Sequence, residues 1–353
     1  MHTQNNINIT SATPLPPPEK LRSLYPISDK IKSKVTKDRA EIQQILDGTS
    51  SKLLAIVGPC SIHDPGEACI YAEKLARIQA KTSEDLTIVM RAYFEKPRTT
   101  LGWKGLIYDP DLSGHYNIQK GIVSARSLLC KLIDKGLPVA TEMLDTVIAQ
   151  YIADLVSWTA IGARTTESQL HRQLASGLSM PVGFKNATDG SMQIALDAIK
   201  TARAPHSFIG VMETDGTVGV FETSGNPWCH IVLRGGEHPN YGAEHVAFLK
   251  VALRKASIPC GIIVDCSHAN SGKDYRKQAV AFNDIAQQIS DGETALKGFM
   301  LESYLLPGKQ TIVPGEKPAP GLSITDGCIG WEETEEILFK AAEASQRRKK
   351  KLS

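Results

Sequence analysis

The sequence predicts an α/β protein folded as a (β/α)8 TIM barrel, and three features of the chain support this prediction. Eight short apolar runs alternate with segments of helical periodicity, which is the order of elements in such a barrel. The runs are mostly continuous, as in strands of a parallel sheet that is buried on both faces. Six of them end on a charged or metal-binding side chain, and barrel enzymes carry their chemistry at the carboxyl ends of the strands.

The expected elements follow one another at short intervals from residue 53 onward. The strands are expected at residues 53–57, 86–91, 137–142, 160–164, 181–185, 230–234, 262–266 and 297–302. Helical patterns between them cover residues 66–79, 122–135, 168–176, 191–202, 243–256 and 274–291. The catalytic barrel is therefore expected to span residues 51–345.

The two ends of the chain lie outside this plan. Residues 1–50 form an N-terminal extension, in which the proline-rich stretch from Pro14 to Pro18 indicates an extended linker. Residues 33–46 then have helical periodicity. Residues 346–353 form a basic tail, which we expect to be a solvated end rather than a binding arm.

One further segment does not fit the barrel repeat. Residues 208–212 and 217–223 flank the pair Asp215-Gly216, which is typical of a tight turn between two antiparallel strands. We therefore expect a β-hairpin inserted in the barrel at about residues 206–224. Such an insertion seldom serves the core, so a regulatory or interface role is expected.

The composition argues against several classes of protein. The formal net charge is +2, and because Arg347 to Lys351 are all cations, the rest of the chain is slightly acidic, so nucleic acid is not an expected partner. No run approaches about 18 apolar residues, so no membrane span is expected. Seven cysteines at irregular spacing do not suggest a disulfide framework, and reduced thiols in a cytoplasmic protein are expected.

Cations gather at the expected carboxyl end of the barrel. Four end a strand and two follow the second strand; the six are Arg91, Lys96, Arg98, Arg164, Lys185 and Arg234. Guanidinium groups match phosphate and carboxylate in a two-pronged geometry. So many cations in one place would repel one another unless multiply charged anions neutralise them. Small phosphorylated or carboxylated metabolites are therefore the expected substrates.

Four metal-binding side chains belong to the same end of the barrel. Cys60, His268 and Glu302 follow the first, seventh and eighth strands, and Asp326 lies beyond the eighth. A thiol, an imidazole and two carboxylates suit a transition metal or zinc. The sequence therefore predicts a divalent metal cofactor of the Mn, Fe, Co or Zn class.

At this point the chain resembles a known family. The likeness runs from about residue 20 to residue 340 and is carried by several specific motifs. They are residues 58–64 (GPCSIHD), 94–100 (FEKPRTT), 162–168 (GARTTES), 181–186 (PVGFKN), 233–236 (LRGG), 265–270 (DCSHAN) and 323–326 (SITD). In these motifs the chain is similar to 3-deoxy-D-arabino-heptulosonate 7-phosphate (DAHP) synthase, type I alpha. That family condenses phosphoenolpyruvate with erythrose 4-phosphate at the entry to the shikimate pathway.

The resemblance implies roles for the positions above. The metal ligands would be Cys60, His268, Glu302 and Asp326. The substrates would contact Arg91, Lys96, Pro97, Arg98, Thr99, Glu142, Ala163, Arg164, Lys185, Arg234 and His268; of these, residues 96–99 would hold erythrose 4-phosphate. The catalytic group would be Lys96, Cys60, His268 and Asp326, with Lys96 as a candidate proton donor.

The sequence is also compatible with two other functions. One is the related 8-phosphate synthase that uses arabinose 5-phosphate, against which the Lys-Pro-Arg-Thr loop and the long N-terminal extension argue. The other is a catalytically inactive barrel that serves as a regulatory subunit or amino-acid sensor. The full set of ligand and cation positions argues against it.

The resemblance also implies feedback control by an aromatic amino acid. The effector would lie between the helices of the barrel and the inserted hairpin, at Thr146, Gln150, Leu174, Leu178, Ser179, Phe208, Gly210 and Phe221. Phenylalanine-regulated members usually have serine where this chain has Gly210, and glycine leaves room for a phenol hydroxyl. Tyrosine is therefore the expected inhibitor. A homodimer or homotetramer is expected, because the family's extension and hairpin usually lie at subunit contacts.

Overall fold

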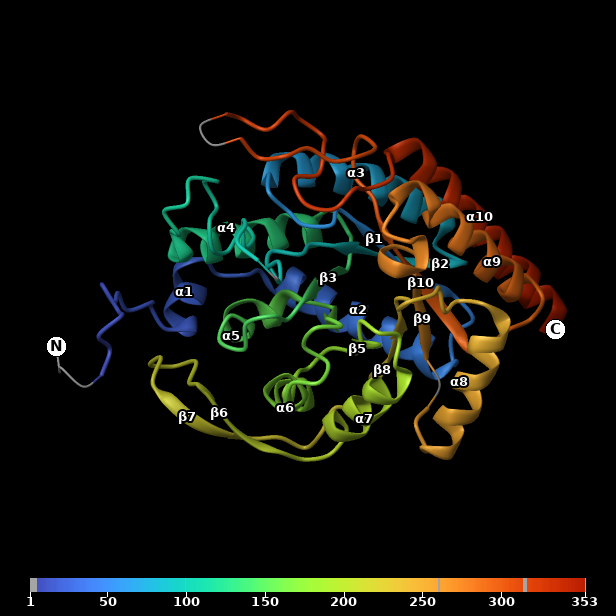
Figure 1. Cartoon of the computed structure of the whole chain (residues 1–353), viewed down its shortest axis with the longest axis horizontal. Coiled ribbons are helices and arrows are strands. Elements are labelled where there is room, and N and C mark those ends of the chain that lie inside the picture. The colour runs from blue at the N-terminus through green and yellow to red at the C-terminus, as the bar shows by residue number, and fades with distance from the viewer. Residues whose placement is uncertain (1–4, 99, 260, 314–315, 353) are drawn as a thin grey trace.

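The structure has the predicted barrel. A computed structural model of the chain describes residues 5–98, 100–259, 261–313 and 316–352. Eight parallel strands close into one barrel, which the helices surround (Figure 1). In their order around the barrel the strands are β1 (Leu53–Gly58), β10 (Leu296–Glu302), β9 (Ile262–Asp265), β8 (Cys229–Leu233), β5 (Val182–Lys185), β4 (Trp158–Ile161), β3 (Val139–Glu142) and β2 (Leu86–Arg91). The predicted (β/α)8 fold is confirmed.

Helices connect successive strands on the outside of the barrel. In chain order they are α3 (Pro65–Thr82), α4 (Ile118–Asp134), α5 (Ala149–Ile152), η1 (Ala153–Leu155), α6 (Gln169–Gly177), α7 (Met192–Ala202), α8 (Ala243–Lys255), η2 (His268–Ser271), η3 (Tyr275–Lys277), α9 (Gln278–Ser290) and α10 (Trp331–Leu352). Among the described residues, no helix combines the length and the apolar character needed to cross a bilayer.

The fourth strand differs from its prediction at residues 160–164. β4 begins at Trp158 and ends at Ile161. The chain turns there because the backbone N–H groups of Thr165 and Thr166 both donate to the carbonyl oxygen of Gly162, at 3.0 and 2.9 Å. Arg164 therefore lies in a loop above the strand rather than at its last position.

A large side chain fills the barrel interior. Trp158 is fully buried, and its indole N–H donates to Nε2 of His230 at 3.1 Å. Nδ1 of His230 donates in turn to the carbonyl oxygen of Trp228 at 3.0 Å. The neighbouring strand makes room with Gly183, where a Cβ atom would lie 2.4 Å from the indole ring. His230 is thus held as a neutral imidazole in the core.

The helix α2 (Asp29–Asp47) closes the amino end of the barrel and contains the helical segment predicted at 33–46. It starts after Ser28, whose hydroxyl caps the first turn, and ends at Gly48, which has a φ of 88°. Ile42 and Ile45 are fully buried and pack against the interior side chains of the strands. The α2 part of the N-terminal extension therefore belongs to the folded body.

The predicted inserted hairpin is also present. It consists of β6 (Ser207–Val211) and β7 (Val218–Glu222), which pair in antiparallel register apart from the barrel (Figure 1). Its turn contacts the short helix α1 (Pro18–Leu24), because Arg22 forms an ion pair with Glu213 at 2.6 Å. The backbone N–H of Glu19 also donates to the carbonyl oxygen of Glu213 at 2.9 Å.

The basic end of the chain is helical rather than a loose tail. α10, which the sequence analysis missed, continues through this segment to Leu352. Arg348 is only 5% exposed, and its guanidinium donates to the carbonyl oxygens of Leu296 and Ser51 at 2.9 and 3.0 Å. Lys349 pairs with Asp85 at 2.9 Å. The cations therefore bind groups at the amino end of the barrel.

The buried imidazole of His230 makes stability depend on pH. Burial lowers the pKa of His230 to about 4, against an ordinary value of 6.5. Between these values the unfolded chain binds a proton that the folded chain does not, so stability is lost as the pH falls from 6.5 towards 4. The loss amounts to about 3 kcal/mol for this group.

This dependence can be measured by thermal unfolding at pH values between 7 and 4.5. His230→Gln keeps one acceptor and one donor but does not titrate, so its melting temperature should fall less over this range. Equal slopes for the two proteins would contradict the assignment.

Candidate active site

A small cavity at the carboxyl end of the barrel brings together side chains from most of the strands. Its volume is about 90 Å3. The residues that line it are Arg91, Tyr93, Lys96, Pro97, Glu142, Gly162, Ala163, Arg164, Lys185, Thr188, Arg234, His268, Glu302 and Asp326. Most of the side chains predicted for a substrate and metal site therefore meet in one place.

The strands themselves explain this convergence. Arg91, Glu142, Lys185 and Glu302 are the last residues of β2, β3, β5 and β10. Because the strands are parallel, their carboxyl ends lie at the same rim of the barrel. Glu142 can point inward because Gly162, the residue after the neighbouring strand β4, has no side chain, and a Cβ atom there would lie 2.3 Å from a Glu142 oxygen.

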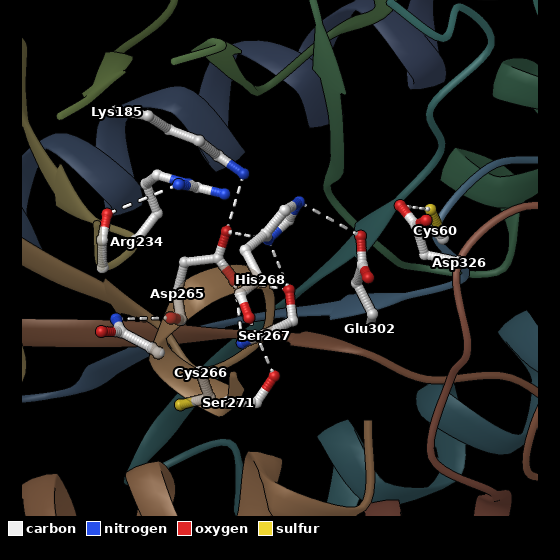
Figure 2. Close-up of polar contacts among 12 residues, drawn as sticks. Cys60, Lys185, Arg234, Asp265, Cys266, Ser267, His268, Ser271, Glu302 and Asp326 are labelled. Atoms are coloured by element: carbon white, nitrogen blue, oxygen red, sulfur yellow. Dashed lines mark hydrogen bonds and ion pairs between the residues drawn. The ribbon is translucent and has the colours of Figure 1, made fainter. Parts of the chain in front are cut away.

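A buried carboxylate holds two side chains of the site in place. Asp265 accepts from Lys185 at 2.7 Å and lies 2.9 Å from Nδ1 of His268 (Figure 2). Burial by itself would raise the pKa of Asp265, but the charges of His268 and Lys185 outweigh this and hold the pKa well below its usual range. Asp265 therefore stays ionised and fixes both side chains at the rim.

Two arginines at the cavity have no such partner. Within the part of the chain that the structure describes, the guanidinium of Arg164 donates only to the carbonyl oxygen of Pro97, at 3.4 Å, and that of Arg234 only to the carbonyl oxygen of Gly235, at 3.5 Å. Among the described residues, neither has a carboxylate within salt-bridge distance. Burial lowers the pKa of Arg234, which reflects the cost of holding an unpaired charge there. Both guanidinium groups are available to an anion.

Next to the cavity lies a group of metal-binding atoms. The ligand atoms of Cys60, Glu302 and Asp326 all lie within 4.8 Å of one another. The thiol donates to Asp326 at 3.3 Å, and the ammonium group of Lys96 lies 2.8 Å from the sulfur and 3.3 Å from Asp326. A positive charge is thus already favoured between these groups. Figure 2 shows Cys60 and Asp326 beside Glu302.

His268 approaches these metal-binding atoms from the opposite side. Its Nε2 atom lies 3.7 Å from Glu302, while Nδ1 is fixed by Ser267 at 2.6 Å and by Asp265 (Figure 2). Its backbone has a φ of 58°, a left-handed conformation that residues other than glycine rarely adopt and that is frequent at functional sites. The imidazole, the thiol and the two carboxylates fit a divalent metal of the zinc or transition series.

Protonation of the thiol agrees with this arrangement. Burial and the charge of Glu302 raise the pKa of Cys60 to about 12, although Lys96 opposes the shift. The thiol is therefore protonated when only Lys96 is beside it. A bound divalent cation removes the proton of a coordinating thiol. The sulfur is thus a ligand that only a strong local positive charge would ionise.

The remaining predicted substrate residues lie around this site. Pro97 and Ala163 line the cavity. Arg98 does not; its Nε donates to the carbonyl oxygen of Trp103 at 2.9 Å, and it lines a neighbouring cavity of about 930 Å3. Thr99 lies outside the described residues.

The sequence analysis missed four residues of the site. Asp265 ends β9 and pairs with Lys185, while Tyr93, Gly162 and Thr188 line the cavity. The signal for Tyr93 was its position two residues after Arg91, since alternate residues of an extended segment face the same side. Asp265 enters the sequence analysis only within the strand expected at residues 262–266 and the motif at residues 265–270, with no role assigned to it.

A second, larger cavity lies between the N-terminal segment, the helices of the barrel and the hairpin. Its volume is about 1060 Å3. Of the residues predicted for an effector, it is lined by Gln150, Leu174, Leu178, Ser179, Phe208 and Phe221. Thr146 and Gly210 do not line it. The rings of Phe208 and Phe221 stack with centroids 5.6 Å apart, and a Cβ atom on Gly210 would lie 2.9 Å from the Phe221 ring.

These features define a barrel protein whose strand ends form a cationic cavity beside a group of metal-binding side chains. Comparisons with known proteins agree. The sequence profile of the DAHP synthetase I family matches residues 28–339. A "Phospho-2-dehydro-3-deoxyheptonate aldolase, Phe-sensitive" from Escherichia coli (strain K12) is 49% identical over 99% of this chain and 100% of its own length.

Two further relatives support the assignment. A Trp-sensitive aldolase of the same name from Salmonella typhimurium is 50% identical over 94% of this chain and 95% of its own. The solved structure of a phospho-2-dehydro-3-deoxyheptonate aldolase from Francisella tularensis SCHU S4 is 47% identical, covers 97% of this chain and 99% of its own, and has a TM-score of 0.93. The chain belongs to the DAHP synthetase I family and is an enzyme.

Proposed function

We propose that this enzyme condenses phosphoenolpyruvate, D-erythrose 4-phosphate and water into DAHP and phosphate, in a metal-dependent reaction that opens the shikimate pathway. The observation that carries the proposal is a pair of guanidinium groups at the cavity, those of Arg164 and Arg234, which have no carboxylate partner among the described residues. They lie beside the metal-binding side chains of Cys60, Glu302 and Asp326. Two anionic substrates need such charge in order to approach each other. Relatives named for this product, at about half identity over nearly the whole chain, support the same reaction.

In the proposed mechanism, the cationic side chains first bind the two anionic substrates. Arg91, Arg164, Lys185 and Arg234 would hold the carboxylate and phosphate of phosphoenolpyruvate, with Ala163 and Glu142 completing the wall. Lys96, Pro97, Arg98 and Thr99 would hold erythrose 4-phosphate. This placement sets C3 of phosphoenolpyruvate against the aldehyde carbon, and much of the rate enhancement comes from such positioning.

The bond changes then follow. C3 of phosphoenolpyruvate attacks the aldehyde carbon, water adds to C2, and phosphate leaves by cleavage of the C–O bond. Lys96 donates a proton to the new hydroxyl oxygen. Although burial lowers the pKa of Lys96, the nearby Cys60 and Asp326 raise it above its usual value, so the group is protonated beforehand. A divalent metal held by Cys60, His268, Glu302 and Asp326 would supply Lewis-acid polarisation of the aldehyde.

The reaction and its metal requirement can be tested together. Phosphate release should require both phosphoenolpyruvate and erythrose 4-phosphate, and arabinose 5-phosphate should not replace the latter. Exhaustive chelation with EDTA should abolish turnover, and Mn²⁺ should restore it, since the donor set prefers such ions. Full turnover in a sample that elemental analysis finds free of metal would refute the metal requirement. Release of phosphate only with arabinose 5-phosphate would refute the substrate assignment.

Removing either guanidinium group that has no carboxylate partner should specifically weaken the binding of phosphoenolpyruvate. A hydrogen bond to a charged group contributes about 1.5–3 kcal/mol, so Arg164→Ala or Arg234→Ala should lower kcat/KM for phosphoenolpyruvate at least about 10-fold. Arg276→Ala is a matched control, because Arg276 is exposed and pairs only with Asp274. Wild-type kinetics in both cavity variants would mean that these arginines do not bind substrate.

We further propose that an aromatic amino acid inhibits the enzyme from the larger cavity, and that tyrosine does so best. Phe208, Leu174 and Leu178 would pack the ring, while Gln150 and Ser179 would offer hydrogen bonds. Glycine at position 210 supports the preference, because a side chain there would crowd the Phe221 ring, which lines the cavity. The relatives named above are sensitive to phenylalanine or tryptophan, so the preference would distinguish this chain from them.

An inhibition panel with tyrosine, phenylalanine and tryptophan tests this preference. Tyrosine should be the strongest inhibitor of the unmodified enzyme. Gly210→Ser should move the preference towards phenylalanine and leave uninhibited turnover unchanged, because the hairpin is remote from the catalytic cavity. Stronger inhibition by phenylalanine or tryptophan, or unchanged selectivity in Gly210→Ser, would contradict the proposal.

We propose a homodimer or homotetramer, in which the outer face of the hairpin is covered. Ile209, Val218 and Val220 are 75%, 74% and 70% exposed in the single chain and lie on the same pair of strands. An apolar face of this kind on an inserted hairpin suits a contact between subunits.

A further inference from the structure

Tyr93 occupies the boundary between the apolar barrel interior and the cationic cavity. Its ring belongs to the interior cluster that contains Trp158 and Met300, and the residue is only 2% exposed. The same residue lines the active-site cavity. Its backbone is fixed, because its carbonyl oxygen accepts from the N–H of Ile62 at 2.8 Å, in the loop that carries Cys60.

The hydroxyl group of Tyr93 has no hydrogen-bond partner among the described residues. Buried polar atoms are nearly always paired, because an unmet donor in a dry environment costs free energy. Burial raises the pKa of Tyr93 above its usual value, so the group is a neutral O–H that can donate. An unpaired donor fixed at a ligand cavity is what remains when a ligand supplies the acceptor.

The neighbouring cation, Arg91, also has donor atoms without a hydrogen-bond partner among the described residues. The guanidinium of Arg91 lies over the ring of Tyr93, 4.0 Å from its centroid, and is 1% exposed. One of its nitrogens approaches Glu302 at 3.4 Å, but Nε and Nη1 are both unpaired. Three unmet donors on two stacked side chains therefore lie together at this cavity.

We propose that the Tyr93 hydroxyl contacts the substrate and donates a hydrogen bond to the anionic oxygens of phosphoenolpyruvate that Arg91 also binds. This inference rests on the proposed function and adds a neutral donor to the cations already described. The Arg91 guanidinium lies over the Tyr93 ring, so the Tyr93 hydroxyl adds a neutral donor to a side chain that directly contacts this cation. Such a donor recognises an oxyanion without adding to the repulsion among the cations.

Tyr93→Phe separates this role from a structural one. The change keeps the ring under Arg91 and removes only the hydroxyl. The dissociation constant for phosphoenolpyruvate, measured by calorimetry on the metal-loaded protein without erythrose 4-phosphate, should rise about 10-fold. The melting temperature should stay the same or rise, because a buried donor without a partner has been removed. Tyr93→Leu, which also removes the ring, should weaken binding further.

Tyr71→Phe serves as the matched control. Tyr71 is equally buried but lies outside the cavity, and its hydroxyl donates to Ser303 at 2.8 Å. Loss of that paired hydroxyl should lower the melting temperature and leave phosphoenolpyruvate affinity unchanged. The opposite signs of the two stability changes distinguish an unmet donor from a satisfied one.

Each possible result of these measurements either supports or overturns the inference. Weaker binding in Tyr93→Phe at an undiminished melting temperature supports the inference. Affinity within about twofold of the unmodified enzyme overturns it, as does weaker binding accompanied by a clear fall in melting temperature. If the unmodified enzyme forms DAHP in either of these cases, only the role of Tyr93 is refuted. An unmodified enzyme that neither binds phosphoenolpyruvate nor forms DAHP would remove the proposed function itself.

Discussion

Repulsion among cations at the carboxyl end of the barrel is the constraint on which the rest of the site depends. Arg91, Lys96, Arg164, Lys185 and Arg234 surround a cavity of only about 90 Å3. Like charges this close in a poorly hydrated environment repel one another strongly. The fold tolerates them because the carboxyl ends of neighbouring strands also carry carboxylates, so each deeply buried cation has an acid within reach.

The carboxylates are distributed unevenly, and this divides the cations into two kinds. Asp265 neutralises Lys185, and Glu302 lies beside Arg91, so these two cations are fixed before any ligand arrives. Within the described parts of the chain, the guanidinium groups of Arg164 and Arg234 donate only to carbonyl oxygens. The first kind is positioned by acids of the protein itself, and the second leaves an excess of positive charge that a multiply charged anion can remove.

Much of this arrangement could be predicted from the sequence, and the reason is geometric. Parallel strands that end on Arg91, Lys185 and Glu302 must bring those side chains to one rim, whatever the details of packing. The end of β4 was predicted wrongly because the turn at Gly162 depends on hydrogen bonds within the loop. Which cation pairs with which acid depends on the closed barrel, since Lys185 and Asp265 lie on β5 and β9 with β8 between them. The helix α10 was missed because its amphipathic pattern merges into a polar, basic end.

The order in which the strands close the barrel also matters for folding of the chain during its synthesis. The last seam joins β1 to β10, with Leu54 beside Gly298, so the first strand synthesised pairs with the last. Until that final strand leaves the ribosome, one edge of β1 has no partner, and an open edge of an apolar strand invites pairing with other chains. Contacts between such distant parts of a sequence also slow folding. More than two hundred residues are synthesised between β2 and β10, and throughout that time the edge of β1 that faces β10 lacks its partner.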